Sequence, residues 1–274
     1  MHEALAYASD LGLPGITNDV NRSLLFLQSL GVLMEDMEGT IRPLTDLNQD
    51  EKQKISTAII EYATLKLDIE PMEIIEKLIV NRYVLKSEPI DSDLCDTKEF
   101  ANLLNACGRT DVGSLGIAIA MGDRKDSYEQ AKEIQANYKK LLTKGLGWVY
   151  DEEKLQQKDH IQYYFGEDVI PENIIGTITS MLIFDSTDRI DKSKPIFGLA
   201  KRINEDVFKV SGRAHESIVD KGVNLSEAIR EACELAGLDV LGGGHPPAAG
   251  TKVPTDKVDL FLEKCDEVIK KQLS

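Results

Sequence analysis

The period of the hydrophobic pattern changes near residue 150, and this change limits the folds that the chain can adopt. Before it, apolar residues recur every three to four positions, which is typical of amphipathic helices, and no segment before residue 90 alternates cleanly. Beyond it, alternating segments are interleaved with helical ones, which indicates a small α/β domain. Strands are expected at 161–165, 195–201, 206–211 and near 251–253.

We therefore predict an α+β or α/β chain. It comprises an N-terminal helical region, a long connector helix, and a small C-terminal α/β domain with a central mixed sheet flanked by helices. In the helical region, Asn48 and Glu51 have the spacing of a capping box, and Pro71 suits the first turn of another helix. The connector is expected to run to about Lys144, where Gly145 and Gly147 would end it.

The charge of the chain is strongly acidic and unevenly distributed. The 274 residues carry 32 basic and 47 acidic side chains, for a formal net charge of −15. This argues against a protein that coats phosphates over a broad surface, which would be basic, but it is compatible with a local basic groove. Residues 1–100 hold 9 basic and 19 acidic side chains. That segment suits a basic protein partner, or it serves solubility, which is the commoner role.

Targeting signals and cysteine pairs do not stand out in this sequence. It shows neither a signal-peptide pattern nor an apolar run of about eighteen residues that would span a membrane. None of the four cysteines is part of a C-x-x-C pair. We therefore expect a cytoplasmic protein with reduced thiols, no membrane partner and no metal site built from cysteines.

The glycine-rich segment Gly242-Gly243-Gly244-His245 is the strongest candidate for ligand binding. Glycines let backbone N–H groups come close to a ligand, and successive N–H groups form an anion-binding concavity. His245 would add a pH-sensitive donor. These residues predict a phosphate clamp. On these residues alone, a glycine turn leading into a strand, with a surface histidine, is an equally good interpretation.

A second candidate follows the strand predicted at 206–211. Arg213 could grip a phosphate with two hydrogen bonds, and the hydroxyl of Ser211 could add a third. Taken alone, an arginine at this place would be an ordinary surface residue.

Together, Ser211–Ala214, Lys221–Leu225 and Gly242–Gly250 resemble the DHH-associated domain of RecJ-type phosphoesterases in order and spacing. Asn105-Ala106-Cys107-Gly108-Arg109 is similar to the N-A-x-G-R element that precedes the connector helix in that family. The archaeal RecJ-like branch is favoured by Leu103-Leu104 and Gly122-Asp123, and by His2–Tyr7 and Leu13–Ile16, which resemble the end of its catalytic domain.

The resemblance implies three parts. Residues 1–95 form a helical region, namely the end of the catalytic domain plus an inserted domain. Residues 96–148 hold the N-A-x-G-R element and the connector, and residues 149–274 form the DHH-associated substrate-binding domain. Cys107, where the family often has alanine, is expected to be a small buried apolar residue.

The family's Asp-rich motif and its Asp-His-His triplet do not occur in this sequence. In the family these motifs hold two divalent ions, usually manganese, which activate water and stabilise the leaving oxygen. Asp159-His160 begins a predicted strand, so we interpret the pair as structural. We therefore expect the chain to be the C-terminal part of a longer enzyme, to be inactive alone and to bind no cofactor itself.

By the same resemblance, the parent protein is a hydrolase that degrades single-stranded DNA or RNA from the 5′ end, with a role in DNA repair or replication. Gly243, Gly244 and His245 would hold the phosphate near the scissile bond, Arg213 and Ser211 a neighbouring phosphate or sugar, and Arg109 the backbone at the interdomain cleft. The predicted substrate- and phosphate-binding residues are Gly242, Gly243, Gly244, His245, Arg213, Ser211, Arg109 and Asn105.

Two other functions fit the same sequence. The chain could be a non-catalytic interaction module that docks onto the GINS replication complex through its acidic helical region, residues 20–95. It could also be half of a phosphodiesterase that acts on short oligonucleotides or cyclic dinucleotides. A related domain of alanyl-tRNA synthetases is disfavoured by the N-A-x-G-R element.

Overall fold

Two compact units make up the protein in a computed structural model. Residues 1–82 with 184–188 form the first unit, and residues 83–183 with 189–274 form the second. Within the residues that the structure describes, no helix is long and apolar enough to span a membrane. These residues are 2–6, 13–17, 19–42, 44–67, 70–78, 81–90, 92–151, 154–185, 189–202, 205–240 and 242–274.

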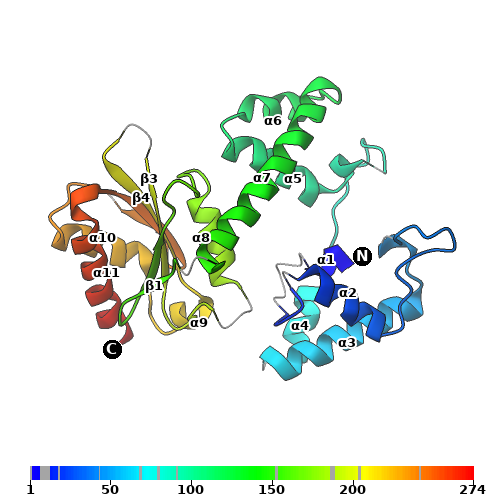
Figure 1. Ribbon diagram of the computed structural model, residues 1–274, viewed down its shortest axis with the longest axis horizontal. Coiled ribbons are helices and arrows are strands. Elements are labelled where there is room, and N and C mark those ends of the chain that lie inside the picture. Colours follow the sequence, from blue (N-terminus) through cyan, green and yellow to red (C-terminus); the bar gives the residue numbers. More distant parts are fainter. Residues whose placement is uncertain are drawn as a thin grey trace. The chain divides into compact units, whose positions relative to one another are not determined.

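The first unit is helical, as predicted. Its helices are α1 (His2–Ala6), α2 (Val20–Ser29), α3 (Gln49–Leu67) and α4 (Pro71–Leu78), with a 3₁₀ turn at Leu44–Asp46 (Figure 1). They enclose a small apolar core that includes Leu13, Ile59 and Ile74. Its size is limited because most of the other apolar side chains of these helices are only partly buried.

The predicted capping box at the start of α3 is confirmed. The Glu51 amide donates to Asn48 Oδ1 at 2.8 Å, and the Asn48 amide donates to Glu51 Oε2 at 3.0 Å. Arg42 joins this pair through two hydrogen bonds of 2.9 Å to the Glu51 carboxylate. The first turn of α3 is therefore tied to the preceding loop by one carboxylate.

The second unit begins with three helices, α5 (Thr97–Arg109), α6 (Gly113–Ala120) and α7 (Asp126–Asp151), after a 3₁₀ turn at Asp93–Cys95. They share a core of buried residues, Leu94, Leu103, Cys107, Ile119 and Ala131. Cys107 is fully buried, as expected for a small apolar residue. All four cysteines are free and buried.

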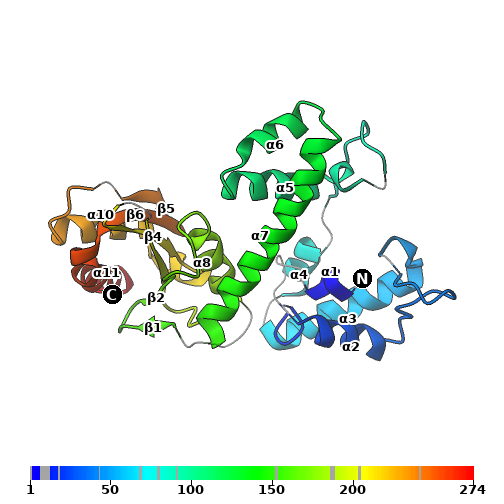
Figure 2. The same cartoon turned by 45° about the horizontal axis from the view of Figure 1, so that its top comes forward.

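The predicted end of the connector helix is wrong, because α7 continues through Gly145 and Gly147 to Asp151 (Figure 2). A Cβ atom at Gly145 would lie 3.0 Å from Ile178 Cδ1 and 3.3 Å from Ile170 Cγ1. Gly145 therefore permits close packing against these two isoleucines. This packing offsets the penalty of about 1 kcal/mol for glycine inside a helix.

A six-stranded mixed sheet forms the centre of the C-terminal part and confirms the predicted fold class. The strand order is β1-β2-β3-β4-β6-β5, in which β2 and β3 are parallel and the other neighbours antiparallel. The strands are β1 (Gln156–Gln157), β2 (Gln162–Phe165), β3 (Ile196–Lys201), β4 (Val207–Arg213), β5 (Gly243–His245) and β6 (Ala248–Pro254).

The interpretation of the glycine-rich segment as a turn leading into a strand holds only in part. Gly243–His245 is itself an edge strand, because it pairs with β6. Pro246 and Pro247 make the connection of this hairpin. Proline is tolerated there because a turn residue needs no ladder hydrogen bond from its nitrogen.

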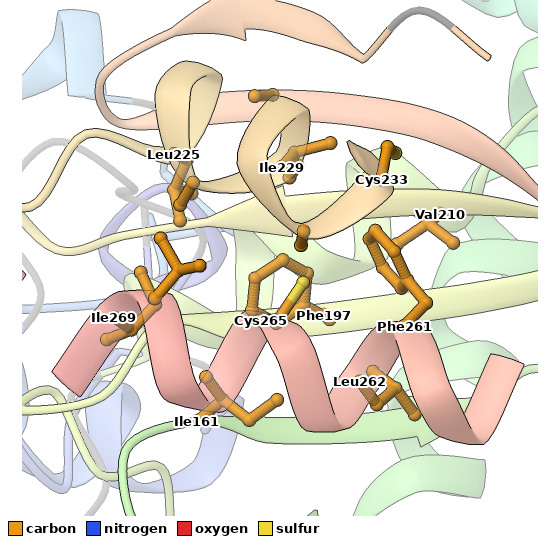
Figure 3. Packing of buried hydrophobic residues seen from close by; sticks show 14 of the residues in the cluster. Ile161, Phe197, Val210, Leu225, Ile229, Cys233, Phe261, Leu262, Cys265 and Ile269 are labelled. Atoms are coloured by element: carbon orange, nitrogen blue, oxygen red, sulfur yellow. The ribbon is translucent and has the colours of Figure 1, made fainter. Parts of the chain in front are cut away.

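The two faces of the sheet are covered differently. On one face, α10 (Leu225–Leu235) and α11 (Val258–Leu273) bury Phe197 and Val210 in a large apolar cluster (Figure 3). On the other face, α8 (Ile175–Ile183) packs against β3 and β4. There Ala248 and Gly250 of β6 stay partly exposed. The remaining elements are α9 (Glu216–Val219) and a 3₁₀ turn at Thr255–Lys257.

The carboxylate of Glu51 gives the first unit a testable pH dependence. The hydrogen bond from Arg42, followed by that from the Asn48 backbone, lowers the pKa of Glu51 from 4.5 to about 2. Because the pKa of Glu51 is lower in the folded than in the unfolded chain, the ionised carboxylate stabilises the folded state at pH values above the unfolded pKa. This stabilisation is lost as the pH falls from about 4.5 towards 2. We expect amide exchange in the first turn of α3 to accelerate over this range after correction for intrinsic rates.

Glu51→Gln should remove this pH dependence, whereas Glu61→Gln on the same helix should retain it. An equal pH profile in the wild type and in Glu51→Gln would contradict the assignment.

Candidate anion-binding groove

The register of β4 and β6 gathers polar side chains on the face that carries α8. Side chains alternate along a strand, so Lys209, Ser211 and Arg213 of β4 point to the same face. Opposite them on β6 lie Lys252, Gly250 and Ala248, respectively. The face therefore has a row of polar and basic side chains on β4 beside small residues on β6.

Beside α8 this face is hollowed into a groove of about 810 Å³, here called the basic groove. Among the described residues, five basic side chains and a single carboxylate, that of Glu172, line it. The groove therefore carries a surplus of positive charge, although the whole chain is acidic. The lining residues are Arg109, Glu172, Gly176, Thr177, Ser180, Arg202, Lys209, Val210, Ser211, Arg213, Val240, Gly243, Ala248, Ala249, Gly250, Thr251 and Lys252.

Glycines make room for the groove. A Cβ atom at Gly176, in the first turn of α8, would lie 3.1 Å from Arg213 Nη2 and 3.2 Å from Ser211 Oγ. At Gly250 a Cβ atom would lie 2.6 Å from the carbonyl oxygen of Val210. The lack of side chains at these positions lets α8 and β6 approach β4 closely while the space above β6 stays open.

Arg213 is held in a fixed orientation by neutral groups. Its Nε donates to Ser180 Oγ at 2.7 Å, and its Nη1 donates to the Gly212 carbonyl oxygen at 2.7 Å. No ion pair between Arg213 and a carboxylate is found in the described part of the chain. Burial, with added repulsion from Arg109, lowers the pKa of Arg213 below its ordinary value. Its charge is thus preorganised but not neutralised, which favours an incoming anion.

Arg109 enters the groove from the end of α5. Asn173 Nδ2 donates to the Arg109 carbonyl oxygen at 2.6 Å, and Arg109 Nη1 donates to the Asn173 carbonyl oxygen at 3.5 Å. These two contacts fix the end of α5 against the loop that leads into α8. Asn105 lies one turn earlier on α5 and is exposed, but it does not line the groove.

Arg202, Glu172, Glu205 and Lys252 form a network of ion pairs along the groove wall. Arg202 Nε lies 2.6 Å from Glu172 Oε2, and its Nη1 lies 2.5 Å from Glu205 Oε1. Glu205 Oε2 is also 3.8 Å from Lys252 Nζ. The neighbouring Lys209 has a lowered pKa, mainly because it is partly buried and also because three arginines surround it.

The four residues of the glycine-rich segment have different surroundings. Gly242 is buried, and a Cβ atom there would lie 2.5 Å from Ile229 Cγ2, so it permits packing against α10. Gly243 lines the groove, with no atom within 4 Å of the position of its Cβ. Gly244 has a φ of +150°, which favours glycine. His245 is exposed and pairs with Ala248, so it points to the same face as Arg213.

Among the predicted site residues, the groove thus brings together Arg213, Ser211, Arg109 and Gly243. The sequence analysis did not identify three further basic residues of the groove: Arg202, Lys209 and Lys252. The alternation of Lys209, Ser211 and Arg213 was a usable signal, because it places all three on one face of a strand. Lys252 could not be found in this way, since its position depends on the β4–β6 register.

The Asp159-His160 pair has a structural contact. The amides of His160 and Ile161 donate to Asp266 Oδ1 on α11 at 2.7 and 3.1 Å. Throughout the described ranges, no three His, Cys, Asp or Glu side chains are grouped so that they could hold a metal ion.

Comparison with known proteins relates both ends of the chain to described domains. Residues 1–79 match the DHH-CID domain, and residues 162–271 match the DHHA1 domain. The chain is 30% identical over 273 residues to an uncharacterized protein of Methanocaldococcus jannaschii, and the match covers 100% of this chain and 53% of that protein. The chain therefore spans about half the length of this curated relative.

Solved structures with a similar fold include CDC45 from Entamoeba histolytica. It has a TM-score of 0.50 and 10% identity, and the match covers 98% of this chain and 55% of that one. RecJ from Thermus thermophilus in complex with Mn²⁺ has a TM-score of 0.47 and 18% identity, with coverage of 63% and 24%. At these identities the likeness concerns the fold alone.

Substitution by alanine should affect stability very differently at the two glycines of β5. A methyl group at Gly243 would enter open space, so Gly243→Ala should leave the stability of the second unit within about 0.5 kcal/mol of the wild type. At Gly244 the new Cβ would lie 2.3 Å from the Ala248 carbonyl oxygen at a φ of +150°, so Gly244→Ala should cost about 1–3 kcal/mol.

Thermal unfolding followed by the fluorescence of Trp148, the single tryptophan, would measure both effects. A destabilised Gly243→Ala would show that this glycine is needed for packing and not for access to the groove.

Proposed function

We propose that the basic groove binds the phosphodiester backbone of a single-stranded nucleic acid. The premise is that the chain belongs to the DHH superfamily and carries its DHH-CID and DHHA1 domains. One observation carries this proposal: Arg213 is partly buried and fixed in the groove, with no acidic partner among the described residues. A phosphate would supply the missing counter-charge, and guanidinium and phosphate groups match in geometry.

The composition of the groove favours backbone recognition over base recognition. No phenylalanine, tyrosine or tryptophan occurs among the described residues that line it, so it offers no platform for base stacking. Hydroxyl groups of Ser180 and Thr177 lie beside the basic side chains, and such groups commonly contact phosphate and sugar. We expect binding that depends little on base sequence and strongly on salt.

At a finer level, we propose that the parent protein is a RecJ-like exonuclease that hydrolyses single-stranded DNA or RNA from the 5′ end. The reaction would use divalent metal ions, usually manganese in this family, held by the Asp-rich and Asp-His-His motifs, which do not occur in these 274 residues. Two such ions supply an activated water and charge stabilisation at the leaving oxygen. The residues of this chain would bind and orient the phosphates, and the chain alone is expected to be inactive.

A second candidate function concerns the acidic N-terminal part. With 9 basic against 19 acidic side chains, residues 1–100 suit a basic partner, and a GINS-type replication complex is the partner that the family resemblance suggests. Deleting residues 20–82, the part of this segment that lies in the first unit, should abolish capture of such a partner and leave nucleic-acid binding intact. Partner capture that is unchanged by the deletion would rule out this role for the segment.

The proposed function predicts distinct effects of substitutions in the groove. Arg213→Ala should weaken binding of single-stranded DNA or RNA, because it removes a preorganised partner of a phosphate. It should also flatten the dependence of log K on log salt by about 0.7, since one phosphate fewer is neutralised. Gly243→Ala should weaken binding as well, since its methyl group would hold a phosphate away from the backbone.

Lys270→Ala is the matched control, because it removes a charge from α11 on the opposite face of the sheet. Filter binding at several salt concentrations would measure these effects. If Arg213→Ala and Lys270→Ala behaved alike, the groove would not be the binding site.

A further inference from the structure

We propose that the basic groove contains a second phosphate-binding subsite, here called the distal subsite, formed by Lys209 and Lys252 with Arg202 beside them. Its ligand would be a strand of several nucleotides, not a single phosphate or a dinucleotide. This inference rests on the proposed function, because it extends the strand held at Arg213 along the same groove.

Lys209 and Lys252 form an unfavourable charge pair. Lys209 of β4 and Lys252 of β6 are direct partners in the antiparallel register, on the face that carries the groove. Directly opposed side chains have Cβ atoms about 4.5–5.5 Å apart, and like charges at such positions destabilise a sheet. An anion between the two ammonium groups would turn this repulsion into two favourable contacts.

The surrounding residues offset this repulsion only in part. Among the described residues, no carboxylate lies within ion-pair distance of Lys209, whose side chain is partly buried, although Glu172 favours its charge from a longer distance. In the described part of the chain, the ion-pair partner of Lys252 is Glu205 at 3.8 Å, and both of these side chains are about half exposed, at 55% and 45%. An exposed pair of this kind contributes little to stability, so a bound phosphate could replace Glu205 at little cost.

Arg202 lies beside the distal subsite but contributes little to its net charge. Glu172 and Glu205 hold its guanidinium at 2.6 and 2.5 Å, so it is fixed in place without a ligand. The two carboxylates offset its charge, and the net positive charge of the distal subsite therefore comes from the lysine pair.

The spacing of the two subsites indicates the length of the ligand. Arg213 and Lys209 lie four residues apart on β4, which corresponds to about 13 Å at about 3.3 Å per residue. Phosphates of a stacked strand follow one another at about 3.4 Å along its axis, so about four nucleotides span this distance, and fewer if the strand is extended. A dinucleotide bound at Arg213 would not reach the lysine pair.

The test compares a thymidine dinucleotide with a thymidine hexanucleotide, both single-stranded, by calorimetric titration of the full chain at low salt. The wild type should bind the hexanucleotide more tightly. Lys209→Gln and Lys252→Gln should each weaken hexanucleotide binding by about tenfold, as is typical when one charged hydrogen bond is removed, and leave dinucleotide binding unchanged. Arg213→Ala should weaken both ligands, and Lys270→Gln neither.

Three results would overturn the distal subsite: equal affinity of the wild type for both ligands, lysine variants that weaken both ligands alike, or lysine variants with no effect. Dinucleotide binding that is insensitive to Arg213→Ala would instead contradict the proposed function. Inorganic tripolyphosphate that competes as well as the hexanucleotide would assign the groove to polyphosphate.

The unfolding temperature, followed by Trp148 fluorescence, separates weaker binding from a weaker fold. Since each lysine substitution removes a repulsion, neither Lys209→Gln nor Lys252→Gln should unfold at a lower temperature than the wild type. If Lys209→Gln did so, Lys252→Gln would decide the question, because the Lys252 side chain is 55% exposed and packs little.

Discussion

The antiparallel pairing of β4 with β6 is the interaction on which the rest of the site depends. Seven consecutive residue pairs, from Val207 with Pro254 to Arg213 with Ala248, fix which side chains share a face. A slip by one residue would turn the basic side chains of β4 into the apolar core under α10 and α11. That slip is prevented because Val210 and Val253, which point to the other face, are buried in that core. The packing of one face therefore positions the charges on the other.

The groove exists because the two faces of the sheet are covered unequally. Two long helices seal the core face, whereas the short helix α8 packs against β3 and β4 on the other. Glycines at the contacts of α8 with β4 and of β6 with β4 bring these elements close without filling the space between them. The small residues therefore have two effects: they allow close packing of the backbone, and they leave the side chains of Arg213 and Lys209 facing open space.

The elements that were predicted correctly are those that local chemistry determines. The capping box of Asn48 and Glu51 marked the start of α3, and alternation marked β2, because both signals lie within a few residues. Packing between residues that are far apart in the sequence could not be predicted from such local signals. Gly145 looked like a helix stop, but it lies inside α7 since Ile170 and Ile178 pack against it. Likewise, Lys252 became a neighbour of Lys209 only through strand register, which a single sequence does not specify.

The net charge of −15 and a phosphate-binding groove are compatible because electrostatic interactions act over short distances in salt water. At physiological ionic strength the screening length is about 8 Å, so exposed carboxylates farther away contribute little to the potential inside the groove. There, the described lining residues include several partly buried basic groups and one carboxylate, and burial weakens screening. Burial disfavours the charges of Lys209 and Arg213 and lowers the pKa of both groups. A phosphate would remove part of this cost of burial, so binding and stability of the groove should be coupled.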